Sequence, residues 1–194
     1  VYAKENVIPE VLEFIGSHKE DRINTLTKEF LDTGDKTPLT KEEEEYANEL
    51  TDDQNLEYLP FGYRMYANNP TADNAYAVAV ALNNCYQYSM AIPWFEKTVE
   101  LDPDDIYARG KLAYIYQQLD MYDKSTETVK DLLDRISDEE ADLRDELYCI
   151  LADNYYFDGK VEEAITWLER VLQESKNEDL ISYTTDTLKK WKNI

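Results

Sequence analysis

The second half of this 194-residue chain repeats itself about every 34 residues. A segment that begins DNAYAVAV is followed by one that begins IYARGKLA and, after a short spacer, by one that begins ELYCILAD. A repeat of this length is typical of units made of two helices, which bury their apolar faces only by stacking on one another. The period therefore predicts an all-α array of helix pairs.

Small and large residues recur at fixed places in the aligned units. One small position holds Ala91, Ser125 and Ala164. The steps between them are 125 − 91 = 34 and 164 − 125 = 39 residues. The longer step shows that 39 − 34 = 5 residues are inserted before the third unit, in the acidic stretch 138–144. The other small position holds Ala79, Ala113 and Ala152. Large apolar residues flank them: Val78, Leu112, Leu151, Leu82, Tyr116, Tyr155, Phe95, Val129 and Leu168. This pattern predicts helices that cross closely at the small residues and interlock on either side.

These positions resemble the tetratricopeptide repeat family. AIPWFEKTVELDP, which ends the first unit with Pro103, and EEAITWLERVL, which follows Gly159, are similar to the second helix of the family's unit. The second unit is less similar, because Asp120 stands in the place of Gly159 and Ser125 replaces alanine. The resemblance implies a right-handed α-solenoid with three units, 72–105, 106–139 and 145–178.

The flanks of the repeats are also predicted to be helical. Residues 1–70 form a divergent helical region, a degenerate repeat or a cap, and residues 179–194 form a capping helix that ends near Trp191. Thr40 and Glu43 have the spacing of a capping box. Apolar stripes at helical spacing support the first two helices of the N-terminal region, with Ser17 as an N-cap between them: Val7, Ile8, Val11, Leu12 and Ile15, then Ile23, Leu26 and Phe30.

Three residues that disfavour helices fall within this helical pattern. Pro60 and Gly62 are expected to interrupt the segment before the repeats, which Asn68-Asn69-Pro70 closes. Pro93 is expected in the first turn of a helix that Ser89 caps, where its missing N–H costs no hydrogen bond.

The charge of the chain restricts its partners. With 42 acidic and 20 basic residues, the formal net charge is −22. Such a chain lacks the cations that bind phosphate backbones or anionic membrane surfaces, so nucleic acid and membrane insertion are not expected. Acidic solvated faces that keep an extended array in solution are the simplest interpretation. We expect a cytoplasmic protein, with an exported or lipid-anchored mature form as the alternative because the chain begins at Val1.

The sequence does not favour an enzyme, a cofactor or a metal site. His18 is the only histidine, and the five glycines are too scattered for a phosphate-binding loop. Cys85 and Cys149 lie in different units and are interpreted as semi-buried thiols, because two cysteines make neither a disulfide framework nor a zinc site.

The resemblance implies that the first helix of each unit lines a concave groove that binds peptides. The candidate groove residues are Tyr76, Asn83, Asn84, Tyr107, Lys111, Tyr114, Gln117, Gln118, Asp153, Tyr156 and Phe157, with Asp73, Ala77, Val80, Gly110, Glu146, Cys149 and Ile150 at the same spacing. Tyrosines offer large apolar area with one polar tip, and the amides can pair with a main chain. Each tyrosine is as well explained by packing between helices.

Co-chaperone members of the family clamp an acidic tail with basic groove residues. The matching places here hold Tyr76, Val80, Lys111, Glu146 and Ile150, of which only Lys111 is basic. Glu146 would repel such a tail, so a neutral, aromatic or basic segment is the expected ligand.

The sequence therefore predicts a non-enzymatic protein-protein interaction module that acts as a scaffold or adaptor. The alternative is a ligand-sensing or substrate-capture domain that regulates a larger or exported protein.

Overall fold

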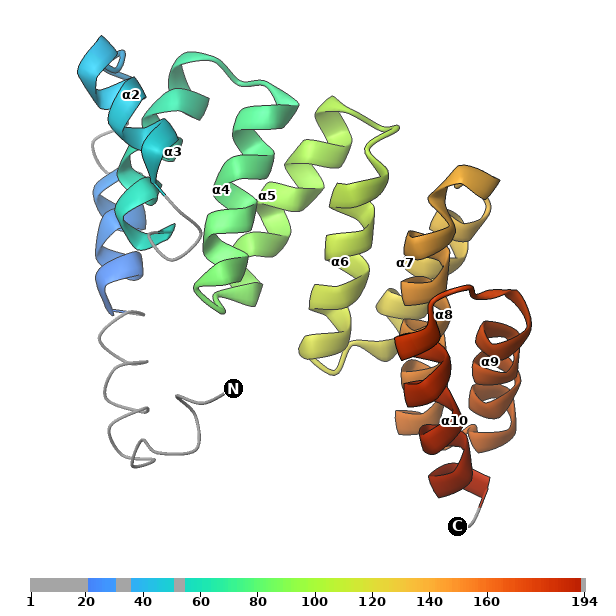
Figure 1. Cartoon of the computed structure of the whole chain (residues 1–194). Coiled ribbons are helices and arrows are strands. Elements are labelled where there is room, and N and C mark those ends of the chain that lie inside the picture. The colour runs from blue at the N-terminus through green and yellow to red at the C-terminus, as the bar shows by residue number, and fades with distance from the viewer. Residues whose placement is uncertain (1–20, 31–35, 51–54, 193–194) are drawn as a thin grey trace. The chain divides into compact units, whose positions relative to one another are not determined.

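The computed structural model describes residues 21–30, 36–50 and 55–192, and every regular element among them is a helix (Figure 1). The predicted all-α fold class is thus confirmed. Apolar stripe residues 7–15, Ser17 and His18 lie outside the described residues.

The chain divides into two compact parts, Val1–Leu101 and Asp102–Ile194, called here the N-terminal half and the C-terminal half. The N-terminal half contains a helix over residues 21–30, α2 (Lys41–Glu49), α3 (Asn55–Asn68), α4 (Ala72–Asn84) and α5 (Tyr88–Leu101). The C-terminal half contains α6 (Ile106–Gln118), α7 (Tyr122–Leu133), the short 3-10 helix η2 (Asp138–Glu140), α8 (Ala141–Phe157), α9 (Val161–Glu174) and α10 (Glu178–Lys192).

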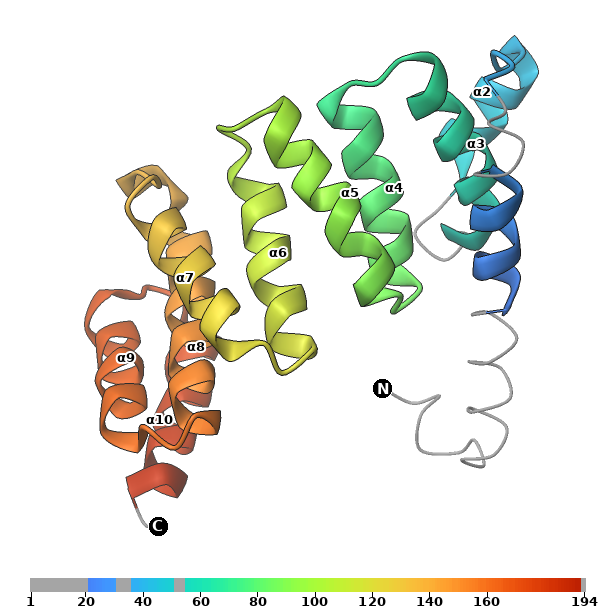
Figure 2. The ribbon, with the colours of Figure 1, turned by 180° about the vertical axis from the view of Figure 1, so that it is seen from behind.

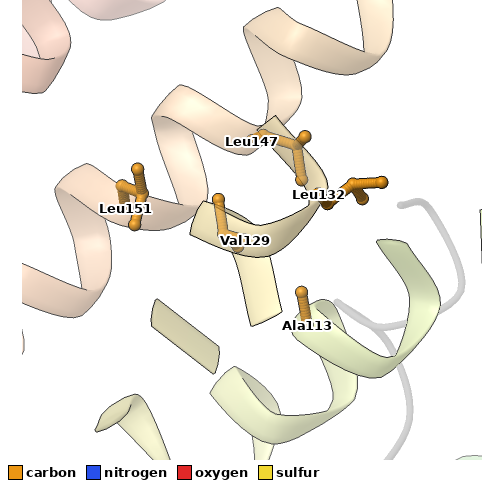
Figure 3. Packing of buried hydrophobic residues seen from close by; sticks show 5 residues of the cluster. All are labelled: Ala113, Val129, Leu132, Leu147 and Leu151. Atoms are coloured by element: carbon orange, nitrogen blue, oxygen red, sulfur yellow. The ribbon is translucent and has the colours of Figure 1, made fainter. Parts of the chain in front are cut away.

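The helices pack through the small residues that the repeat singles out. Both small positions are fully buried in all three units: Ala79, Ala113, Ala152, Ala91, Ser125 and Ala164. In the C-terminal half, Ala113 of α6, Val129 and Leu132 of α7, and Leu147 and Leu151 of α8 form one buried cluster (Figure 3). Helix α8 contacts both α7 and α9 (Figure 2). Small side chains let these helices approach closely, and the larger ones fill the space beside each crossing.

Each helix pair is joined by the same turn. In each of the three repeat units, the second residue after the first helix has a positive φ: Tyr86 at 61°, Asp120 at 58° and Gly159 at 78°. The N–H of the following residue donates to the carbonyl five residues back in each case, Gln87 to Leu82, Met121 to Tyr116 and Lys160 to Tyr155, at 2.8–2.9 Å. This is the Schellman motif, in which glycine is the least strained residue. Tyrosine and aspartate therefore occupy a position that favours glycine.

The prolines and the glycine of α3 and α5 do not have the effects that the sequence predicts. Helix α3 runs through both Pro60 and Gly62, so the predicted interruption is wrong. Gly62 is buried, and a Cβ there would lie 3.1 Å from a methyl group of Val78, so the glycine lets α3 and α4 approach. Helix α5 begins at Tyr88, and Ala91 N–H donates to the Gln87 carbonyl, so Ser89 lies inside the helix and Pro93 lies beyond its first turn.

The capping box at α2 forms as predicted. Thr40 Oγ1 accepts from the Glu43 N–H at 3.2 Å, and the Thr40 N–H donates to Glu43 Oε2 at 2.8 Å. Arg64 of α3 donates to both oxygens of Glu43 and to the Thr37 and Pro38 carbonyls. The hydrogen bond from Arg64 is the main reason that the pKa of Glu43 is lowered. Arg64 thus fastens the start of α2 to α3.

Helix α10 covers the last repeat. Leu188 of α10 is buried in a cluster with Ala152 of α8 and Leu168 of α9. Thr184, also on α10, is fully buried. Lysines occupy the last turn of α10, where the helix dipole favours positive charge: Lys189, Lys190 and Lys192.

Candidate binding groove

A groove of about 780 Å³ lies in the C-terminal half between α6 and α8. One wall is formed by α6, in which Tyr107 is 65% exposed and Tyr114 is 39% exposed. The complete lining is Tyr107, Gly110, Lys111, Tyr114, Glu139, Glu140, Asp142, Leu143, Glu146, Leu147 and Ile150. Six of these residues are at the spacing that the sequence assigns to the groove: Tyr107, Gly110, Lys111, Tyr114, Glu146 and Ile150.

The floor of the groove is apolar and continuous with the core. Leu147 is fully buried in the cluster that Figure 3 shows. Leu143 and Ile150 pack against the same cluster. Gly110 lies in the middle of α6, and a Cβ there would be 3.6 Å from Leu143 Cδ1, which is an ordinary contact. The packing therefore does not require glycine at this position, although glycine in a helix interior costs about 0.5–1 kcal/mol relative to alanine.

Carboxylates dominate the charge of the groove. Four of them line it, Glu139, Glu140, Asp142 and Glu146, against the single cation Lys111. Glu140 also closes the turn before α8, because its Oε2 accepts from the Ser137 N–H at 2.7 Å. Hydrogen bonds from Ser137 lower the pKa of Glu140. Three lining residues, Glu139, Glu140 and Asp142, come from the insertion and were not predicted to line the groove, although the break in the repeat period marks their location.

The candidate residues of the first unit lie in the N-terminal half and do not line this groove. Tyr76, Ala77 and Val80 line a smaller pocket of about 300 Å³ formed with α2 and α3. Tyr76 also packs edge-on against Phe95. Asn83 donates to Asn84, which donates to Asn55 of α3, at 3.3 Å each. These amides are engaged with each other and with α3.

Gln117 belongs to a buried polar network at the contact of α6, α7 and α8. Its Nε2 donates to Asn154 Oδ1 at 3.0 Å and to the Ile150 carbonyl at 3.3 Å. Asn154 Nδ2 donates to Ser125 Oγ at 2.8 Å, and Ser125 Oγ donates to the Ala113 carbonyl at 2.8 Å. This network gives Gln117 a structural role. Its neighbour Gln118 is exposed.

Tyr156 and Phe157 belong to a row of aromatic rings at the end of α8. Tyr156 stacks on Trp191 of α10, with ring centroids 4.2 Å apart and planes 8° apart. Phe157 stacks on Tyr122 of α7 at 5.6 Å and remains 62% exposed. Tyr156 and Trp191 therefore hold α10 against α8, which accounts for the tryptophan at the end of the capping helix.

Two half-buried side chains of α8, Cys149 and Asp153, have raised pKa values. Burial raises the pKa of Asp153 above its usual value. Burial, reinforced by Asp153, Asp145 and Glu146, raises the pKa of the Cys149 thiol to about 12. At neutral pH Cys149 is therefore a protonated thiol, which is a poor nucleophile.

A second pocket, of about 640 Å³, lies between α7, α8 and α9. Arg170 lies over the rings of Tyr148 and Trp167, at 4.8 and 5.5 Å from their centroids. Glu174 accepts from Arg170 Nε at 2.8 Å and from the Tyr148 hydroxyl at 3.0 Å. The remaining lining residues are Lys130, Leu133, Asp134, Ile136 and Arg144.

Two searches of the described residues concern other classes of site. No group of three or more His, Cys, Asp or Glu side chains within residues 21–30, 36–50 and 55–192 has the geometry to hold a metal ion. In the same ranges, no helix combines the length and the apolar character that a membrane span requires.

Comparisons with known proteins agree with the helical repeat. Residues 145–178 match the model of the tetratricopeptide repeat. No curated protein matches the chain. Among solved structures, YrrB, a TPR protein with an unusual peptide-binding site, aligns with a TM-score of 0.60 and 16% identity over 69% of this chain and 67% of YrrB. MamA from AMB-1 aligns with a TM-score of 0.49 and 19% identity over 66% of this chain and 81% of MamA. The YrrB alignment establishes the fold.

Proposed function

We propose that this chain, a tetratricopeptide-repeat protein, is a non-enzymatic interaction module that binds a segment of another protein between α6 and α8. Its role would be that of a scaffold or adaptor. The observation that carries the proposal is the groove of about 780 Å³ with Tyr107 and Tyr114 on one wall. Pockets that combine apolar surface with a few polar groups are the usual binding sites of proteins.

The tyrosine wall would supply much of the affinity. Tyr107 and Tyr114 are separated by two helical turns, so a bound segment passes both rings. Aromatic side chains contribute large contact areas at low cost in conformational entropy, and tyrosine is enriched among the residues that dominate binding. Gly110 lies between them, where the absence of a side chain lets a main chain approach α6.

The charges of the groove favour a neutral, aromatic or basic segment over an acidic one. An acidic ligand would meet Glu139, Asp142 and Glu146 with only Lys111 to compensate. Like charges brought to close range lower affinity, and this effect increases as water is excluded. The peptide-binding site of YrrB supports peptide binding as a function of this fold.

Alanine substitution of the two wall tyrosines tests the proposal. Tyr107→Ala with Tyr114→Ala is expected to abolish the retention of capped heptapeptide pools on the immobilised protein, because it removes the aromatic surface that a segment would cover. Tyr183→Ala is the matched control, since Tyr183 is 62% exposed on α10 and does not line the groove. Circular dichroism should show unchanged helix content for both variants.

Peptide retention by the double variant equal to that of the wild type would place binding outside this groove. Equal loss in the Tyr183 variant would show a general effect of surface tyrosines.

A further inference from the structure

The insertion that breaks the repeat period builds one wall of the groove. By the 39-residue step, the counterpart of Ile106 is Asp145 (106 + 39 = 145), yet α8 begins at Ala141 and has 17 residues, whereas α6 has 13. The five inserted residues thus fall within the segment 138–144, which forms η2 and an additional first turn of α8. Ser137 caps η2 in a capping box with Glu140, which fixes the turn. Glu139, Glu140, Asp142 and Leu143 from this segment line the groove opposite α6.

The α8 side of the groove carries carboxylates that form no ion pair within the described residues. No ion pair within the described part of the chain involves Glu139, Asp142 or Glu146. Glu139, Asp142 and Glu146 are also exposed. By contrast, other surface carboxylates such as Asp131 and Glu174 are paired with arginines. A cation in the groove would therefore meet negative charge that is not already neutralised.

The groove also fits the apolar part of a basic side chain. Lysine and arginine have long aliphatic stems that pack along apolar surface while the charged group stays near water. Leu143 and Ile150 offer such a surface, and Tyr107 and Tyr114 of α6 line the same groove. A cation over a tyrosine ring gains about 0.5–1 kcal/mol at an exposed site. Stem, ring and carboxylate contacts are thus available within one groove.

We propose that the insertion, together with Glu146 of α8, makes this groove selective for a protein segment that carries lysine or arginine. The inference rests on the proposed function and adds its specificity: Glu139, Asp142 and Glu146 recognise the positive charge, and Tyr107 and Tyr114 hold the segment. Lys111 opposes the cation and limits the selectivity.

The experiment compares three pools of capped heptapeptides on the immobilised protein. The pools are randomised at the outer positions and carry lysine, glutamine or glutamate at two fixed central positions. The wild type should retain the lysine pool roughly tenfold more than the glutamine pool, as expected for several exposed ion pairs. The glutamate pool should be retained least, and added salt should reduce the difference.

Two variants with the same change of net charge separate local from global electrostatics. The groove variant combines Glu139→Gln, Asp142→Asn and Glu146→Gln. The control variant combines Glu127→Gln, Glu163→Gln and Asp179→Asn, which are exposed and do not line the groove. The groove variant removes one acidic residue from the first turn of an α-helix, Asp142, and the control variant removes two, Glu163 and Asp179, so the control includes at least as large a change in helix-dipole interactions. Only the groove variant should lose the preference for lysine.

Each outcome decides between the two proposals. Equal retention of the lysine and glutamine pools by the wild type, with both reduced by the Tyr107 and Tyr114 substitutions, would overturn the selectivity and leave the binding function intact. A lysine preference that falls equally in the groove and control variants would assign it to the net charge of the chain and overturn the inference. Retention of no pool above the level of the double tyrosine variant would overturn the binding function itself.

Discussion

The groove between α6 and α8 and the pocket between α7, α8 and α9 lie in the same half of the molecule, but their charged groups have different surroundings. In the pocket, Arg170 lies over two aromatic rings and pairs with Glu174. In the groove, Glu139, Asp142 and Glu146 have no ion-pair partner within the described residues, and Tyr107 is largely exposed. The charged group of the pocket is thus held by its own contacts, whereas the groove carries exposed carboxylates and the exposed ring of Tyr107. The following changes test this difference.

Truncation in the pocket should cost the most stability. Trp167 packs against the buried clusters on both sides of α8 and lies under Arg170, so Trp167→Ala should lower the free energy of unfolding by about 3 kcal/mol. Tyr107→Ala, at the exposed wall of the groove, should change it by less than about 0.5 kcal/mol. Urea denaturation measures both values, and similar losses would contradict the distinction between the two regions.

Substitution in the polar network of Ser125, Asn154 and Gln117 should cause the next largest loss of stability. Ser125→Ala restores the alanine of the other units but leaves Asn154 Nδ2 with only the longer hydrogen bond to Thr126 Oγ1, at 3.3 Å, at a cost of about 1 kcal/mol. Adding Asn154→Leu should recover only part of this loss, because it removes the amide that lost its acceptor but also takes Asn154 Oδ1 from Gln117, which keeps the Ile150 carbonyl as an acceptor. Urea denaturation of the single and double variants measures the coupling. A Ser125 variant as stable as the wild type would show that the network is not a structural requirement.

Gly110 should separate stability from binding. Gly110→Ala is expected to raise the free energy of unfolding by about 0.5–1 kcal/mol, since it removes glycine from a helix interior and the new methyl group has room beside Leu143. The same methyl group projects toward the groove wall, so retention of the peptide pools should fall. Thermal denaturation and peptide retention measure the two effects.

Tyr86→Gly is the control substitution, because it is also an exchange between glycine and a residue with a side chain but at a position outside the groove. It should stabilise by about 1 kcal/mol, because Tyr86 has a φ of 61° that glycine adopts without strain. Tyr86 lies in the N-terminal half and does not line the groove, so peptide retention should stay unchanged. If both substitutions impair binding equally, Gly110 has no special role in the groove.

Substitution of Asp153 should change the free energy of unfolding the least, and this change should depend on pH. Burial raises its pKa in the folded state above the value of about 3.9 expected in the unfolded chain. The carboxylate therefore destabilises the fold at neutral pH, and this penalty is relieved as the pH falls through the raised pKa. Asp153→Asn should stabilise the protein at pH 7, and the gain should vanish near pH 4. A gain that persists at pH 4 would show that ionisation is not its cause.

The repeat made the packing of this protein predictable from sequence. Small residues at fixed places predicted the helix crossings, and all six of them are buried. Spacing also predicted the capping box of Thr40, because caps are formed by residues three positions apart. The predicted interruption at Pro60 and the predicted first-turn position of Pro93 are wrong because local rules keep proline out of helix interiors, whereas helices α3 and α5 continue through it. Packing of the helix against its neighbours outweighs one lost hydrogen bond.

The groove was predictable only in part. The register of the repeat places Tyr107, Gly110, Lys111 and Tyr114 on one face of α6, and all four line the groove. The same register cannot show that Trp191 would stack on Tyr156 or that Asn154 would engage Gln117, because each contact joins positions far apart in the chain.

The sequence by itself determined that this chain forms stacked helix pairs, because a small residue recurring at each crossing is a local property that every unit repeats. Only the tertiary structure decided that the inserted segment brings carboxylates into the groove that the tyrosines of α6 line. An insertion has no counterpart in the other units from which its location could be inferred, and its side chains acquire a role only where two helices distant in sequence come together.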